Sequence, residues 1–275
     1  MHQPSPERPP LDARTVLAAW NVEPVLVAGL GATALVYLRG WRRLRARRPA
    51  RIGVRHLVAF LGGLGTLFMA LASPLDTLSD RLLAVHMAQH IVLLVVTPPL
   101  LLLGTPLMPL LFGLPMGRLR VLLGRLAARI DDCFGHPLVG LVAMSFATWG
   151  WHAPAAFELA LHHRAWHVVE HASFLTAGLL FWWPVVRPWP YRRRWPRPAM
   201  IPYLLIADLQ NTALAAILVF SDRVLYPSYG LGPGALADQV VAGVLMWVPM
   251  SLAYLVPAGV LTTRWLSPDT GRRGI

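Results

Sequence analysis

Long apolar stretches alternate with arginine-rich connections along most of the chain. A transmembrane helix needs about 20 consecutive, mostly apolar residues. Seven stretches meet this length, near residues 16–38, 55–73, 82–104, 137–158, 165–186, 199–220 and 236–261. The pattern predicts an all-α fold, a polytopic membrane bundle of seven transmembrane helices. Pro98 and Pro99 are expected to kink the third helix, because proline removes an intrahelical hydrogen bond.

The basic residues, all of them arginine, are divided unevenly between the connections. Twenty of the 25 arginines lie in segments 39–55, 113–136 and 187–198 and in the tail after Leu261, and five lie in the other connections and the N-terminal tail. Cytoplasmic loops carry an excess of arginine and lysine. We therefore expect the N-terminus outside and the C-terminus in the cytoplasm. The net charge of +12 then marks the cytoplasmic face, and we expect no nucleic-acid partner.

The composition agrees with a membrane protein whose solvent is lipid. The 275 residues are 56% hydrophobic and 14% charged, whereas soluble domains are about 25% charged. The mean hydropathy is +0.52. We expect a multi-pass protein of the bacterial plasma (inner) membrane. The single cysteine, Cys133, excludes an intramolecular disulfide and leaves nitrogen, oxygen and thioether groups as the main metal ligands.

The pattern divides the chain into three parts. Residues 1–15 lack the basic-then-apolar order of a signal peptide and are expected to form an exposed N-terminal tail. Residues 16–261 form the seven-span membrane domain, and residues 262–275 form a cytoplasmic tail. Within the domain, residues 116–131 carry leucines on one helical stripe among arginines. This segment is expected to be an amphipathic helix on the inner membrane surface.

Two pairs of histidines with the same spacing begin the third and fifth apolar stretches. His86 and His90 form one pair, and His167 and His171 form the other. Residues four apart lie on one face of a helix, about 6 Å apart, and histidine is costly at membrane depth. With the orientation above, His152 near the end of the fourth stretch reaches the same outer level. The histidines expected in this outer region are His86, His90, His152, His162, His163, His167 and His171.

These imidazoles are candidate metal ligands. Neutral imidazole suits copper, zinc, nickel and iron, so two pairs and His152 have the donors for one or two ions. Bis-histidine haem is a competing ligand, but it uses one histidine from each helix and leaves the second member of each pair over. A third possibility has no ligand: the imidazoles then bond to one another, to Glu170 and to water at the level of the lipid headgroups.

Other polar residues extend the candidate site. Asp76, Glu170, Asp238 and Gln239 are expected on the outer side, where their oxygens are suited to orient ligating imidazoles. Met87 follows His86 and offers a thioether for monovalent copper.

A separate polar pair, Asp208 and Asn211, falls in the middle of the sixth stretch. It is a candidate intramembrane path for ions or protons, or an interhelical hydrogen-bond cluster.

Four strings in order resemble the multi-spanning CtaG family of bacterial cytochrome c oxidase assembly proteins: HMAQHIVLLVVTPPLLLLGTPL, WHAPAAFELAL, HVVEHASFLTAGLLFWWPV and DQVVAGVLMWVP. The resemblance covers most of the chain between Ser73 and Pro257. It implies a plasma-membrane factor that assembles, or supplies copper to, a haem-copper oxidase. It also implies His86, His90, His152, His167 and His171 as copper ligands, with Glu170 and Asp238 in support.

The leading hypothesis is therefore an assembly factor for cytochrome c oxidase that binds copper, as Cu(I), at an outer-facing histidine cluster and delivers it to an oxidase subunit. The expected partners are that subunit, membrane lipid and a periplasmic copper chaperone. The sequence has no nucleophile motif and no phosphate-binding glycine loop, so we expect no enzymatic activity. The alternatives are a bis-histidine haem cytochrome and a copper transporter whose path includes Asp208.

Overall fold

The computed structural model describes residues 20–115, 117–191 and 195–267. All regular elements in these ranges are helical, which confirms the all-α prediction. In the first half they are α2 (Pro24–Arg47), α3 (Val54–Ala72), α4 (Pro74–Ser79), α5 (Leu83–Ile91), the π-helical η1 (Val92–Val96), α6 (Thr97–Leu103), α7 (Leu107–Gly113) and α8 (Gly117–Phe134). In the second half they are α9 (Pro137–His152), α10 (Pro154–His162), α11 (Arg164–Val186), α12 (Met200–Phe220) and α13 (Pro233–Leu266), with short 3-10 turns at η2 (Arg197–Ala199) and η3 (Pro227–Tyr229).

Within the described ranges, five helices are long and apolar enough to cross a membrane: α2, α3, the continuous helix Leu83–Leu103, the helix Arg197–Phe220 and α13. The other two expected spans correspond to α9 and α11. The helix α9 has 16 residues, because the chain turns at Ala153 before Pro154 and continues as the separate helix α10. The helix α11 has 23 residues but carries several polar side chains in its first half. The seven-span count, the orientation and the terminal tails stay predictions.

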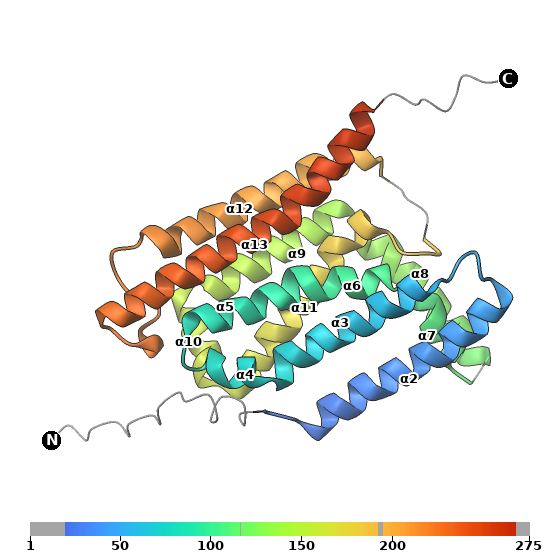
Figure 1. The fold of residues 1–275 in the computed structure, drawn as a ribbon, viewed down its shortest axis with the longest axis horizontal. Helices are drawn as coiled ribbons and strands as arrows, with labels where there is room; N and C mark the ends of the chain where they lie inside the picture. Colours follow the sequence, from blue (N-terminus) through green and yellow to red (C-terminus); the bar gives the residue numbers. More distant parts are fainter. Residues whose placement is uncertain (1–19, 116, 192–194, 268–275) are drawn as a thin grey trace.

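The helix Leu83–Leu103 lies at the centre of the bundle (Figure 1). In its most apolar window 61% of the residues are buried, against 11% for α2. On one side α13 packs against α5, and α12 packs against α13. On the other side α3 packs against α6, while α2 lies against α7 and α3. The helix α11 packs against η1 and α6 and against α9, so the two elements that carry histidine pairs are direct neighbours.

The prolines of the central helix fix how α11 meets it. Pro98 has no N–H group, so the carbonyl of Leu94 lacks its usual helical donor, and the Trp182 indole N–H donates to that carbonyl instead, at 3.1 Å. Gly178 makes the close approach possible: a Cβ atom there would lie 2.7 Å from Pro98 Cγ and 2.8 Å from the Leu94 oxygen. Gly178 lies about two turns after Glu170 on α11, so these contacts fix where Glu170 sits along the central helix.

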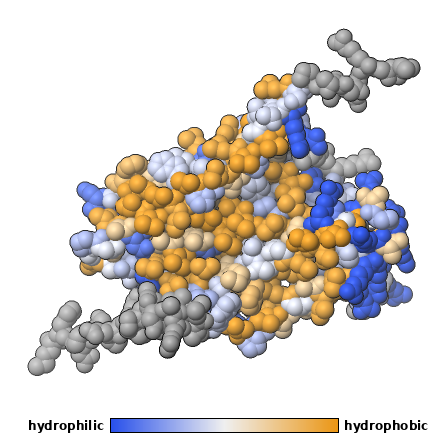
Figure 2. All heavy atoms as spheres, in the orientation of Figure 1, coloured by the Kyte–Doolittle hydropathy of each residue, from blue (hydrophilic) through white to orange (hydrophobic). Residues whose placement is uncertain are grey.

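The surface separates an apolar belt from a charged end. Figure 2 shows hydrophobic side chains over the middle of this face and hydrophilic side chains gathered at the end where α2 finishes and α8 lies. Large apolar side chains such as Val25 and Phe146 are 83% and 80% exposed, as expected for a surface in contact with lipid. On α8, Leu122, Leu126 and Ile130 are exposed together, which fits the amphipathic helix expected there.

Candidate metal centre

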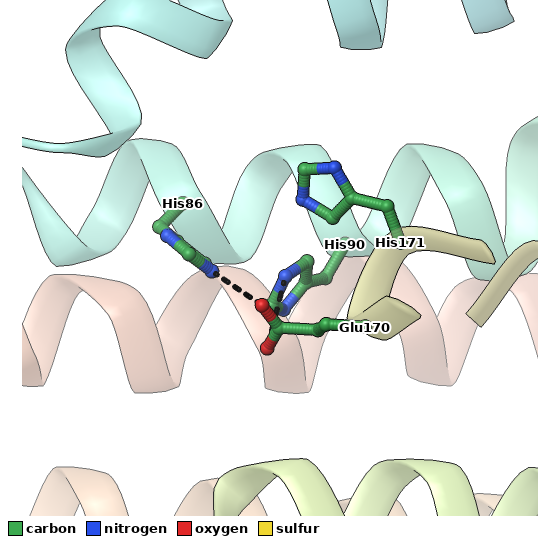
Figure 3. Close-up of side chains that lie close together, drawn as sticks. All are labelled: His86, His90, Glu170 and His171. Carbon is green, nitrogen blue, oxygen red and sulfur yellow. Dashed lines mark ion pairs between the residues drawn. The ribbon is translucent and has the colours of Figure 1, made fainter. Parts of the chain in front are cut away.

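Four buried side chains from two neighbouring helices converge on one point (Figure 3). The helix α5 supplies His86 and His90, one turn apart, and α11 supplies Glu170 and His171. The Glu170 side chain reaches toward both imidazoles of α5. One ligand atom from each of the four residues lies within 4.8 Å of the others. These donors have the arrangement needed to hold a metal ion.

The distances between these atoms are too long for hydrogen bonds. His86 Nε2 lies 3.8 Å from one Glu170 oxygen, and His90 Nε2 lies 3.6 Å from the other. Neither nitrogen has a hydrogen-bond partner, nor do the Glu170 oxygens, His90 Nδ1 or His171 Nε2. Buried polar atoms are almost always paired. Two ligands on one tetrahedral ion lie roughly 3.4 Å apart, from metal–ligand bonds of about 2.1 Å. A metal ion bound by these atoms would account for both the spacing and the missing partners.

Tyr229 of η3 helps to hold the orientation of His86, together with the Ser79 backbone. The Tyr229 hydroxyl donates to the Ser79 carbonyl at 2.8 Å and lies 3.1 Å from His86 Nδ1. A hydroxyl has one hydrogen to donate, so it accepts the N–H of Nδ1. Nε2 then presents its lone pair to Glu170 and the metal centre. Tyr229 lies 143 residues from His86 in the chain, and no motif or spacing in the sequence indicates this contact.

Asp238 and Gln239 on α13 hold the framework around the metal centre. The Asp238 carboxylate accepts from the backbone N–H groups of Leu83 and Ala84 at 2.6 and 3.2 Å, at the beginning of α5. Gln239 accepts from the Leu225 N–H at 2.7 Å and donates to two backbone carbonyls around the α12–α13 connection. The Asp238 contacts fix the beginning of α5, the helix that carries His86. The Gln239 contacts fix the α12–α13 connection, which carries Tyr229.

Asp76 on α4 is joined to the central helix through Gln89, whose role no motif in the sequence indicates. Gln89 Nε2 donates to Asp76 at 3.1 Å and to the Ala70 carbonyl at 2.7 Å. The second Asp76 oxygen accepts from Asn21 at 2.9 Å. Asp76 also lines a cavity of about 600 Å³ beside the metal centre, together with His167 and His171.

The remaining candidate ligands surround the group of four. The His167 ring lies 4.1 Å from that of His171 and 5.6 Å from that of His86, and its Nε2 atom is buried without a partner. The His152 ring lies 6.3 Å from the His90 ring. Its Nε2 atom contacts Met87 Sδ at 3.3 Å. All five predicted histidines thus lie in one region, with His152 and His167 at its edges.

Asp208 and Asn211 lie away from this region, on α12. The Asn211 side chain is buried and donates to the Met246 carbonyl of α13 at 3.2 Å. Asp208 is half-buried, and one of its oxygens has no hydrogen-bond partner. Asn211 thus joins α12 to α13 by a hydrogen bond, and the role of Asp208 stays a prediction.

Residues 35–267 match the family described as cytochrome c oxidase caa3 assembly factor. The chain belongs to this family. It is also 28% identical to uncharacterized proteins of Mycobacterium bovis and Mycobacterium tuberculosis over 276 aligned positions, which cover 95% of this chain and 41% of each relative. An uncharacterized protein of Mycobacterium leprae is 26% identical over 87% of this chain and 39% of its own. This member of the family thus spans about two fifths of the length of these relatives. No solved structure matches it.

Proposed function

We propose that this protein binds copper at His86, His90, Glu170 and His171 and supplies it to a subunit of a caa3-type cytochrome c oxidase during assembly. The observation that carries the proposal is the convergence of these donors within 4.8 Å, with ring nitrogens and carboxylate oxygens that have no hydrogen-bond partner. The family connects the chain with oxidase assembly. Copper is the ion that a haem-copper oxidase requires, and imidazole is a suitable ligand for it.

The position of the metal centre supports delivery on the outer side of the plasma membrane. It lies near the beginning of α5, close to α4 and α10, whereas hydrophilic side chains gather at the other end of the bundle, where α2 ends and α8 lies (Figures 1 and 2). Both of these helices are rich in arginine. Arginine-rich ends of membrane helices face the cytoplasm. A seven-span topology with the N-terminus outside then places the copper near the periplasm, where an oxidase subunit and a periplasmic copper chaperone are the partners we infer.

The proposal describes a carrier of copper without catalytic activity. Of the alternatives, a bis-histidine haem would use two imidazoles and leave the Glu170 carboxylate buried beside the macrocycle without a partner. The contact of Asn211 with the α13 backbone favours a packing role for the α12 polar residues over a copper path.

An anaerobic titration tests the copper site. The detergent-purified protein competes for Cu(I) with a coloured chelator, beside the variants His86→Ala and Glu170→Gln. Each variant removes one donor, and we expect its affinity to fall by more than about tenfold. His163→Ala, an exposed histidine at the end of α10, serves as the control and should bind as the wild type does. Wild-type protein that withdraws no copper from the chelator would overturn the proposed copper site.

A test in cells addresses assembly. A strain that lacks the protein should lose caa3-type oxidase activity in copper-poor medium, and the His163→Ala variant should restore it. The His86→Ala variant should not. Full restoration by His86→Ala would separate the assembly role from this metal centre.

A further inference from the structure

His152 and Met87 face each other in a buried position next to the metal centre. His152 Nε2 lies 3.3 Å from Met87 Sδ, and the two residues are 5% and 0% exposed. Neither belongs to the group of four converging donors. They come from different helices, α9 and α5, and the contact joins the end of one to the middle of the other.

The hydrogen bonds of His152 show which of its nitrogens carries the hydrogen. Nδ1 lies 2.7 Å from the Thr148 carbonyl, which can only accept, so Nδ1 is the donor. In the neutral ring Nε2 then has a free lone pair, and the thioether of Met87 has no hydrogen either. A second ring hydrogen would satisfy this contact only by burying a positive charge, which is costly. Two lone-pair donors therefore point at each other with no hydrogen between them.

This geometry suits two ligands of one soft ion. With bonds of about 2.05 Å to nitrogen and 2.3 Å to sulfur, ligands at a tetrahedral angle lie roughly 3.5 Å apart. Thioether sulfur favours monovalent copper over hard cations. The His152 backbone is itself held, because the Tyr226 hydroxyl donates to its carbonyl at 2.9 Å. His152 is thus held at both its ring and its backbone, and these contacts fix the position of Nε2.

His90 is placed to serve both positions. Its ring lies 6.3 Å from the His152 ring and 5.6 Å from the His171 ring, and both of its ring nitrogens lack hydrogen-bond partners. No hydrogen bond therefore fixes this imidazole toward one set of donors or the other.

We propose that Met87 Sδ and His152 Nε2, with His90 as a third donor, form a second binding position for a monovalent soft ion, Cu(I), beside the group of four. The inference rests on the proposed copper-binding function and deepens it. An ion moves between the two positions by exchange of ligands at His90, with no change of oxidation state. The thioether gives this position its preference for the monovalent ion, and the ion exchanges in either direction with the imidazole and carboxylate group beside it.

X-ray absorption on protein loaded anaerobically with Cu(I), at one and at two equivalents, tests this position. We expect a sulfur neighbour of copper at about 2.3 Å, which Met87→Leu removes together with one bound ion. Leucine nearly conserves the volume of methionine, so the variant should fold. Met144→Leu, a methionine of α9 that is 2% exposed, is the matched control and should keep the sulfur signal. His152→Gln, a second variant, should also lose one ion.

The outcomes separate this inference from the proposed function. Copper bound by nitrogen and oxygen alone, with equal numbers of ions in wild type and Met87→Leu, would overturn the second position and leave the group of four in place. Wild-type protein that binds no copper would overturn both. A sulfur signal that persists in Met87→Leu and disappears in Met144→Leu would show that another methionine is the ligand, and this too would refute the assignment.

Discussion

Replacing Tyr229 by phenylalanine removes a single hydroxyl group that does not belong to the converging donors. In the wild type this hydroxyl accepts the His86 Nδ1 hydrogen at 3.1 Å and donates to the Ser79 carbonyl at 2.8 Å. Without it, His86 keeps its packing and its contact with the Ser79 backbone but loses one of the partners that hold the hydrogen on Nδ1, so the tautomer with the hydrogen on Nε2, which blocks metal binding, becomes more populated. The prediction is that Tyr229→Phe weakens copper binding although all four donor residues are intact.

The size of the effect follows from the role of such contacts. Loss of a hydrogen-bond partner that orients a ligating histidine typically lowers metal affinity by about 10- to 100-fold, or about 1.4–2.8 kcal/mol. Burial, with a further contribution from Asp80, raises the pKa of the Tyr229 hydroxyl. The hydroxyl therefore keeps its hydrogen at neutral and mildly alkaline pH. The difference between wild type and variant should stay constant across that range.

The assay is the same anaerobic competition for Cu(I), with Tyr203→Phe as the matched control. Tyr203 is also buried, and its hydroxyl donates to the Phe181 carbonyl at 2.8 Å, but it contacts none of the four donors. Both variants lose a buried hydroxyl, so a difference between them reports on His86. Equal copper affinities for Tyr229→Phe and wild type would refute the orienting role.

Two predictions concern stability in detergent. Asp131→Ala leaves the Arg187 guanidinium, bonded to that carboxylate at 2.6 and 2.9 Å, as a buried charge without its carboxylate. The variant should lower the free energy of unfolding by about 3–5 kcal/mol, while the exposed neighbour Asp132→Ala changes it by less than about 1 kcal/mol. Trp182→Phe removes the donor to the Leu94 carbonyl and should cost about 1–3 kcal/mol. The exposed control Trp166→Phe should leave the free energy of unfolding unchanged. Equal unfolding midpoints for Asp131→Ala and Asp132→Ala, or for Trp182→Phe and Trp166→Phe, would contradict the reasoning.

Much of the fold follows from hydrophobic length alone. Most of the expected apolar stretches became helices with nearly the predicted ends, as α3 and α12 show, because lipid leaves the backbone few alternatives to a helix. The helix expected over residues 16–38 is α2, which begins at Pro24 and continues through arginines to Arg47, since charged side chains limit the apolar stretch without ending the helix. The fourth ends at His152, and Pro154 begins α10. That proline was a readable signal, because the residue before a proline disfavours helix.

The candidate site was predictable where it depends on helical spacing and not where it depends on tertiary contacts. Spacing of four residues placed His86 and His90 on one face, and the same rule applied to α11. Asp238 was expected beside the imidazoles, but its carboxylate binds the backbone at the beginning of α5. A carboxylate serves equally well as a cap or as a hydrogen-bond partner of a ligand, and the sequence does not distinguish the two roles. Tyr229 lies in a connection with no helical period to place it.

A site that both binds and releases an ion needs a closed side that holds the ion and an open side where its ligands can exchange. The helix α5 is fixed at its beginning by Asp238, and α11 is fixed to the central helix by Gly178 and Trp182, so the donors stay at their spacing without an ion. This preorganisation favours binding, because little ordering remains to oppose it. On one side of the centre His171 also lines the cavity, which gives an exchanging ligand an approach. On the other side Glu170 is fully buried. Under the proposed function, the ion held by the group of four would therefore exchange on the cavity side, and the buried carboxylate would hold it on the closed side.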